Sequence, residues 1–505
     1  MLYLSEGFTY IFSDPLTIVL LIAGNLFGII FGCIPGLTAT LGVILLIPFT
    51  YGMSPVQGLT LLISEYVGGI SGGLIAACTI NIPGTPSSVI TTWDGYPMAK
   101  KGRPGTALGI GVFCSMLGGI FSAFALIFIA PPLAKMALMF GSWEVFAIGI
   151  MGLAVVIGMC SNSLAKGIIG VLFGMVWGAI GLDPVSGVTR LTFGHWQLLG
   201  GLNDTAVCMG LFAVAEILLQ TRELGRPKTK IEIKKFSLKP PSRKEMEGCA
   251  VPITLGSIYG TVIGIVPAIG QTVASMITYN HTKSLSKTPE KFGTGYGPGI
   301  AASETANNAV NGGALIPLIT LGIPGDTVTA ALIGGLMIHG LRPGPILFVD
   351  HPEIIGGIMV AYFFANIVMY LLEQGIMVGF VKLLDVKMSY LFPAILLCCV
   401  LGVYTINNRM FDVWVMLIFG IAGFLFERLG FDMFPPIMGY ILGILIESNM
   451  TTGLIASGGS FAGIMEKPIA VVLITIAFLF LIGPVISRYF KRRKQEINAT
   501  NIKNI

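Results

Sequence analysis

The chain has 505 residues, of which 54% are hydrophobic and only 11% are charged, and its mean hydropathy is +0.85. An ordinary soluble domain carries roughly 25% charged residues, so the composition excludes a soluble protein. Since a membrane span needs about 20 apolar residues, the length predicts an all-α polytopic membrane protein with about 12 spans. The 67 glycines suit membrane helices that pack closely or unwind locally.

The first apolar segment carries a glycine-proline pattern that recurs, in the same register, in the second half of the chain. The two copies are Gly24-x3-Gly28-x3-Gly32-x2-Pro35-Gly36 and Gly256-x3-Gly260-x3-Gly264-x2-Pro267-Ala268. A longer polar stretch also occurs once in each half. It reads Ser64-Glu65, Gly72-Gly73, Ile82-Pro83-Gly84-Thr85 and then Ser303-Glu304, Gly312-Gly313, Ile323-Pro324-Gly325-Asp326-Thr327. Small-residue helix packing explains single glycines, but only an internal repeat explains the shared order.

The repeat divides the chain into four parts. We predict one repeat over 1–221 with its hairpin motifs in 24–105, and a second over 247–460 with its motifs in 256–344. A basic linker, 222–246, joins them, and 461–505 holds an extra span and a basic tail. Both basic segments are expected in the cytoplasm by the positive-inside rule. Nucleic-acid binding is the competing interpretation, and it is disfavoured because apolar spans adjoin both segments.

Loop charges orient the two repeats. The loop 50–57 has no charge, whereas 283–291 carries three lysines; later, 100–103 is basic and 339–353 is not. The repeats are therefore predicted to be inverted, with opposed hairpins over 58–99, entering from outside, and over 292–340, entering from the cytoplasm. This places the N-terminus outside. The broken segments 16–50 and 250–280 either cross the membrane or re-enter it.

Helices that break at membrane depth survive only where protein or a water-lined cavity satisfies the freed backbone groups. Amides at a half-helix start attract anions, so the breaks and the polar residues around them predict a binding site. A single serine or threonine more often bonds to its own helix backbone, whereas three asparagines within one short stretch favour a polar cavity. The candidate substrate-binding residues are Pro35, Gly36, Thr38, Asn81, Gly84, Thr85, Ser87, Asn307, Asn308, Asn311, Gly325, Asp326 and Thr327.

Two acidic residues lie within the repeated stretch. Glu65 and Glu304, beside Ser64 and Ser303, are candidates for cation binding and coupling, and helix capping is the structural alternative. Sodium is the only metal ion expected, and no other cofactor is. The four histidines form no H-E-x-x-H motif, and nucleophile elbows and phosphate loops are absent from the sequence, so we expect no enzyme activity.

Three motifs together resemble a known family. Gly28-x3-Gly32-x2-Pro35-Gly36-Leu37, Asn81-Ile82-Pro83-Gly84-Thr85-Pro86-Ser87 and Gly322-Ile323-Pro324-Gly325-Asp326 are similar to the large membrane subunit of the tripartite tricarboxylate transporters, over roughly 16–486. The resemblance implies a permease subunit in the bacterial inner membrane that imports citrate-like di- and tricarboxylates with a sodium or proton gradient.

The resemblance also implies two partners, a small membrane subunit of about four spans and an extracytoplasmic substrate-binding protein. It further implies the elevator-type architecture of an ion-transporter superfamily, with two inverted repeats. A channel or another non-coupled membrane module is the alternative function, since it shares the hydropathy.

Overall fold

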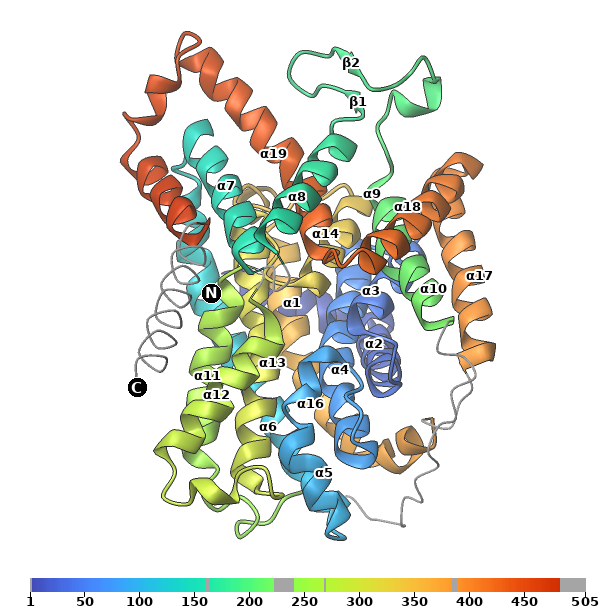
Figure 1. The fold of residues 1–505 in the computed structure, drawn as a ribbon, viewed down its shortest axis with the longest axis vertical. Helices are drawn as coiled ribbons and strands as arrows, with labels where there is room; N and C mark the ends of the chain where they lie inside the picture. Colours follow the sequence, from blue (N-terminus) through green and yellow to red (C-terminus); the bar gives the residue numbers. More distant parts are fainter. Residues whose placement is uncertain (1, 160–162, 222–239, 268, 384–387, 482–505) are drawn as a thin grey trace, which may run out of the picture. The chain divides into compact units, whose positions relative to one another are not determined.

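The computed structural model describes residues 2–159, 163–221, 240–267, 269–383 and 388–481 (Figure 1). The basic C-terminal tail and most of the basic linker lie outside these residues. The first helices are α1 (Leu2–Ser13), α2 (Pro15–Cys33), α3 (Ala39–Thr50), α4 (Pro55–Ile80), η1 (Pro86–Val89), α5 (Thr92–Lys100), α6 (Pro104–Ala137), α7 (Ser142–Met159) and α8 (Leu164–Gly178).

Two short strands, β1 (Gly181–Leu182) and β2 (Thr189–Arg190), then form an antiparallel pair. The remaining helices are η2 (Trp196–Leu198), α9 (Asp204–Cys208), η3 (Met209–Val214), α10 (Ala215–Thr221), α11 (Ala250–Ile265), α12 (Gly270–Leu285), η4 (Pro289–Lys291), α13 (Gly297–Leu321), α14 (Thr327–Ile338), α15 (Leu347–Asp350), α16 (Pro352–Leu383), α17 (Met388–Asn407), α18 (Met410–Arg428), α19 (Phe434–Ala456) and η5 (Phe461–Ile464).

The described residues contain seven helices that are long and apolar enough to cross a membrane, which confirms a multi-pass, all-α membrane protein. Six shorter apolar helices accompany them, among them α3, α11 and α14. The total of 12 spans and the elevator architecture stay predictions. Helix α1 was not anticipated from the sequence; its Gly7 packs directly on the backbone of α16 at Gly356.

Local sequence explains where the repeated helices begin and end. In α4, Ser54 and Gln57 form a capping box and Pro55 occupies the first turn, where its missing N–H costs nothing. The helix ends at Asn81, whose φ of 58° is left-handed. At the corresponding position of the second repeat α13 ends at Gly322, with φ of 72°. Both residue types tolerate this conformation, which terminates a helix.

Spaced glycines bring the helices of each repeat into backbone contact. A side chain at Gly24, Gly28 or Gly32 of α2 would overlap backbone atoms of α4. Gly260 and Gly264 of α11 meet the backbone of α13 in the same way. The pairs α2–α4 and α11–α13 are therefore equivalent, and close van der Waals packing holds both.

The broken helix pairs α2–α3 and α11–α12 each return to the end from which they start. Asp14, which caps α2, accepts a hydrogen bond from Gln57 (2.7 Å), and α3 ends at Thr50, which lies against Gly58 of the same α4 start. In the second repeat, the start of α11 and the end of α12 line one pocket together with the start of α13. These segments, left open from sequence as 16–50 and 250–280, therefore turn back within the fold, and we call them the re-entrant pairs.

The segments expected as hairpins, 58–99 and 292–340, instead run from one end to the other. Helix α5 ends beside the loop before α13, where Lys101 donates to the carbonyl of Thr294 (2.6 Å). At the other end, His339 after α14 lies against Gly58. We call the end with Lys101, Thr294 and the start of α11 the basic end. The broken spans traverse in opposite directions, as an inverted repeat requires.

Contacts divide the chain into two compact units. The first comprises Met1–Leu138 and Asn203–Leu425, and the second Met139–Leu202 and Phe426–Ile505. In the second unit α19 packs on α7 and α8, and Arg190 of β2 pairs with Glu447. Each unit takes segments from both predicted repeats. All the repeated motifs lie in the first unit, which therefore contains the whole candidate site.

Candidate functional site

Four chain breaks meet in the first unit, and each is followed by a new helix. Helices α3, α12 and α14 begin at these breaks, and the short η1 begins at the fourth. Gly84 packs against Gly32 and Gly73, with its amide donating to the Gly73 carbonyl (3.2 Å). Gly325 packs equivalently against Gly264 and Ala314. The Pro-Gly tips of the broken spans thus rest on the breaks of the re-entrant pairs.

Each tip also touches the re-entrant pair of the other repeat. The hydroxyls of Thr40 in α3 and Thr327 in α14 lie 2.9 Å apart. Thr272, which occupies the position in the second repeat that Thr40 occupies in the first, donates to the carbonyl of Pro86 in η1 (3.1 Å). The two contacts are related by the repeat. In each contact one partner comes from the first repeat and the other from the second. We call these two the crosswise contacts.

Asp326 is the most heavily bonded side chain at a tip. Its Oδ2 accepts from the Tyr66 hydroxyl and from Nε2 of Gln271, each at 2.5 Å, while Oδ1 accepts from the Thr329 amide (2.7 Å). Gln271 also donates to Oδ1 of Asn311 (3.4 Å). One carboxylate therefore caps α14 and binds side chains of α4 and α12, and Gln271 extends the contact to α13. Asp326 and Asn311, both predicted, are brought together through Gln271.

The asparagine cluster of α13 is fully buried and mostly unpartnered. Both side-chain polar atoms of Asn307 lack a hydrogen-bond partner, as do Oδ1 of Asn308 and Nδ2 of Asn311. Asn308 donates only to the carbonyl of Glu304, one turn earlier (3.2 Å). Buried amides without partners are costly, and these unpaired atoms have the chemistry to hydrogen-bond a polar ligand.

Ser303 and Glu304 lie in a hydroxyl-rich cluster. Glu304 accepts from Thr91 and, at 2.9 Å, from Ser115 of α6. The Thr91 hydroxyl also lies 3.0 Å from that of Ser303, and Ser275 of α12 donates to the Ser303 carbonyl (3.0 Å). Both carboxylate oxygens of Glu304 are thereby satisfied at its buried position.

Glu65, the repeat counterpart of Glu304, has no such partners. It is fully buried, and neither carboxylate oxygen has a hydrogen-bond partner. Its Oε1 lies directly against Gly42 in the first turns of α3, where any side chain would overlap it. Ala274 occupies the position in the second repeat that is equivalent to Gly42. The second repeat therefore lacks the space beside its helix that a carboxylate occupies in the first. Ser64 instead hydrogen-bonds the Leu21 carbonyl and Asn25 of α2.

The remaining predicted residues lie at the breaks themselves. Pro35 and Gly36 form the α2–α3 break, where Gly36 has φ of 97° and its carbonyl accepts from Gln220 of α10. Thr38 caps α3 by accepting from the Leu41 amide (3.1 Å).

In the first-repeat tip, Thr85 and Ser87 are 2.7 Å apart and buried. Asn81, in contrast, is exposed at the end of α4, apart from this buried pair.

Several polar residues of the site were missed from sequence. They are Tyr66, Thr91, Ser115, Gln220 and Glu373. Glu373 of α16 is fully buried and accepts from Ser71 of α4 (3.0 Å). Glu373 could have been recognised from the sequence, because it is an acidic residue within an apolar run.

The electrostatics of the first unit are one-sided. Its buried side chains include four carboxylates around the breaks, whereas none of the buried side chains among the described residues is Lys or Arg. The four are Glu65, Glu304, Asp326 and Glu373. Positive charge near the breaks can therefore come only from helix amino ends, bound cations or protons.

Inverted broken spans, paired re-entrant helices and buried polar tips define a membrane transport protein of the broken-helix class. The sequence of residues 18–438 matches the family described as "Tripartite tricarboxylate transporter TctA family". The chain belongs to this family of transporters, and it is a membrane component of tricarboxylate transport.

Two relatives come from Agrobacterium vitis. One, described as an uncharacterized 52.8 kDa protein in the TAR-I ttuC' 3' region, is 35% identical over 473 residues, covering 94% of each chain. The other, an uncharacterized protein in the TAR-II ttuC' 3' region, is 34% identical over 236 residues, which are 47% of this chain and 98% of that protein. No solved structure matches the chain.

Proposed function

We propose that the chain is the permease subunit of a binding-protein-dependent secondary transporter that imports citrate-like di- or tricarboxylates across the bacterial inner membrane, driven by a sodium or proton gradient. The crosswise meeting of the two tips with the two re-entrant breaks is the observation that carries this proposal. Such paired breaks form the substrate sites of broken-helix transporters.

The proposed substrate site takes a carboxylate without a basic side chain. Helices α3, α12 and α14 all begin at the breaks, and the amino end of a helix attracts an anion. Gly36, Thr38, Gln271, Thr272 and Thr327 are only partly buried, so this edge is accessible to a ligand. The unpartnered amides of α13 supply further donors.

Glu65 is the first coupling residue that we propose, because its carboxylate is buried without a partner, and Ser64, Ser303 and Glu304 are further candidates. A charged carboxylate without partners in a membrane interior is strongly disfavoured, so Glu65 holds a proton or a cation in this arrangement. Binding a cation beside an incoming anion would also reduce the repulsion between the substrate and the buried carboxylates. This links the driving gradient to substrate uptake.

We further propose that the basic end faces the cytoplasm. Lys101, Arg103, Lys287 and Lys291 gather there, as the positive-inside rule requires. The partners are a small membrane subunit and an extracytoplasmic binding protein that delivers substrate to the opposite end. A cysteine introduced at Leu285 should react with an impermeant thiol reagent from the cytoplasm alone, and labelling from outside would reverse the orientation.

Replacing Asn308 by alanine should lower substrate uptake at least about 10-fold, since a polar ligand would lose a buried amide partner worth about 1–3 kcal/mol. The measurement is uptake of radiolabelled citrate and related carboxylates into proteoliposomes that contain the small subunit and the binding protein. Asn81→Gly tests the neighbouring prediction, because glycine keeps the left-handed helix end and removes only the side chain. Unchanged uptake in N308A would remove the α13 cluster from the site, and unchanged uptake in N81G would restrict Asn81 to helix termination.

Replacing Glu65 by glutamine should abolish accumulation of substrate above equilibrium, because the neutral amide cannot exchange a proton or a cation. The assay compares uptake with a sodium gradient, a proton gradient or neither. Glu144→Gln is the matched control, since Glu144 is buried but only accepts from the Gly141 amide at a helix start (3.0 Å). Gradient-driven accumulation that persists in E65Q would exclude Glu65 from coupling. Substrate that equilibrates but never accumulates in the unmodified protein would favour a channel.

A further inference from the structure

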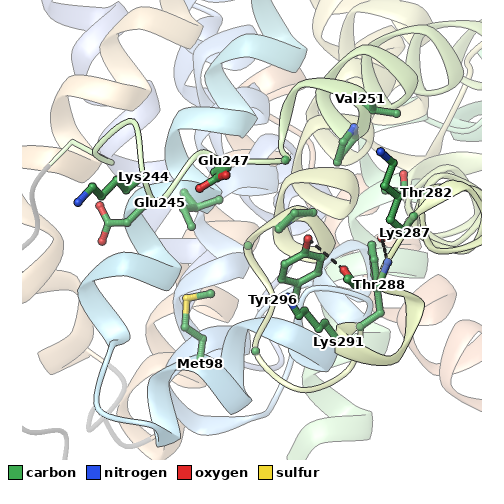
Figure 2. Close-up of a pocket in the computed structure, with 18 of the residues that line it drawn as sticks. Met98, Lys244, Glu245, Glu247, Val251, Thr282, Lys287, Thr288, Lys291 and Tyr296 are labelled. Carbon is green, nitrogen blue, oxygen red and sulfur yellow. Dashed lines mark hydrogen bonds between the residues drawn. The ribbon is translucent and has the colours of Figure 1, made fainter.

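A second polar site lies at the basic end of the first unit, outside the crosswise contacts. It is a pocket of about 720 Å³ between the linker, the start of α6 and the α12–α13 connection (Figure 2). This volume falls within the range of roughly 300–1,000 Å³ that is typical of small-molecule sites. None of the pocket residues belongs to the proposed transport site.

Basic side chains surround the pocket. Arg103, Lys244, Lys287 and Lys291 line it, against two acidic residues. Figure 2 shows Lys287 and Lys291 on one side, and Lys244 on the other with its amino group directed away from them. One of the acids, Glu245, is already engaged with Thr106 (2.8 Å) and Ser242 (2.8 Å). The side chains of Lys244 and Lys287 form no hydrogen bond or ion pair with the described residues, so their charge is available to a ligand.

Two helix amino ends add to this positive character. The N-cap residues of α6 and α11, Arg103 and Cys249, make no capping hydrogen bond with their side chains. The start of α13 also lines the pocket, but its Tyr296 amide already donates to Asp94. The carboxyl ends of α5 and α12 reach the pocket at Met98 and Leu285. Amino ends of long helices favour an anion, and here they act together with four cationic side chains.

A buried hydroxyl points independently to a ligand. Thr282 lines the pocket and is only 4% exposed, yet its Oγ1 has no hydrogen-bond partner. Most hydroxyls in membrane helices bond to their own backbone, as Thr278 does one turn earlier (2.8 Å). A free hydroxyl beside Lys287 is therefore a ready donor to an oxygen of a bound anion.

From these features we propose that the pocket binds a small polyanion of the phosphate or polycarboxylate type, held by Lys287 and Lys291, the amino ends of α6 and α11 and the Thr282 hydroxyl, with Lys244 at its rim. The apolar walls at Met98, Val251 and Phe292 accommodate an attached carbon skeleton. The ligand would contact the linker, α12 and α13 together. Its binding would therefore make the second repeat respond to the concentration of the anion in the cytoplasm. The site stands whether or not the chain transports citrate.

The test measures binding of inorganic pyrophosphate to the full-length protein in nanodiscs of zwitterionic lipid, by calorimetry at low ionic strength. We expect saturable binding, weakened about 5-fold or more by Lys287→Gln and by Lys244→Gln because each change removes a charged contact. Lys283→Gln is the matched control, since Lys283 lies on α12 next to Thr282 but does not line the pocket. This variant should bind pyrophosphate as the unmodified protein does. Thr282→Val retains shape and breaks no existing bond, so it should fold normally and bind more weakly.

A second arm separates the sources of the anion. Nanodiscs with anionic lipid should compete with pyrophosphate if a lipid headgroup is the natural occupant, and should leave binding unchanged if a free cytoplasmic anion is. Absence of saturable binding would overturn the proposal. Equal weakening by K283Q and K287Q would also overturn it, because general surface charge would then account for the effect.

Discussion

Replacing Gly28 of α2 by valine should prevent the first unit from folding, so that little monodisperse protein is recovered from membranes. A side chain there would overlap the Glu65 carbonyl and lie 2.7 Å from the Gly69 amide nitrogen, and backbone cannot move aside as a flexible side chain can. Overpacking costs about 1–3 kcal/mol even where side chains yield, so the cost here should lie at or above that range. The measurement is the yield and thermal stability of detergent-solubilised protein.

Gly375 provides the matched control. It also lies within a long apolar helix, α16, but a side chain there would meet nothing within 4 Å. Gly375→Val should therefore give protein of normal yield and stability. If G28V folded as well as G375V, the close α2–α4 contact would not be a determinant of the fold.

Replacing Asp94 of α5 by alanine should destabilise the basic end by about 3–5 kcal/mol, because four hydrogen bonds to a buried carboxylate would be lost at once. Its Oδ1 accepts from the amides of Gly293 (3.0 Å), Gly295 (2.8 Å) and Tyr296 (2.8 Å), and Oδ2 accepts from the Tyr279 hydroxyl (2.7 Å). One buried carboxylate thus fixes the start of α13 to the end of the first broken span. Thermal unfolding of the purified protein measures the loss.

Two further substitutions test this explanation. Asp94→Asn keeps an oxygen for the three amides, so it should lose much less stability than D94A. Asp350→Ala removes an exposed acid without a hydrogen bond among the described residues, and it should change nothing. Equal losses in D94A and D94N would attribute the effect to the charge of Asp94 rather than to its hydrogen bonds.

Sequence patterns predicted the parts of the fold that depend on local chemistry. The glycine spacing in 24–36 and 256–268 indicated close helix packing and a repeat, and the Pro-Gly pairs indicated where helices break. These features follow from backbone sterics between near neighbours in the chain, so they can be recognised without the fold. Whether 16–50 crosses or returns depends on where its two ends lie, which the hydrogen bond from Gln57 to Asp14 reveals only in three dimensions.

The composition of the site could be predicted only in part. Asp326, Asn308 and Glu304 were recognised because polar residues are conspicuous in apolar segments. Tyr66 was not, since its role depends on meeting Asp326 across 260 residues. Nor could the sequence distinguish Glu65 from Glu304, because the different surroundings of the two acids arise from contacts with α3, α6 and Thr91.

The contacts between the two repeats also have a consequence for how the protein is made. Thr91 meets Ser303, and Thr40 meets Thr327, so the first repeat emerges from the ribosome long before its partners in the second. At translation rates of roughly 5–20 residues per second this interval is on the order of 10–60 s. During that time the acids of the first repeat are already in the membrane without their final surroundings. The membrane insertion machinery must therefore retain or shield the nascent first half until the second arrives.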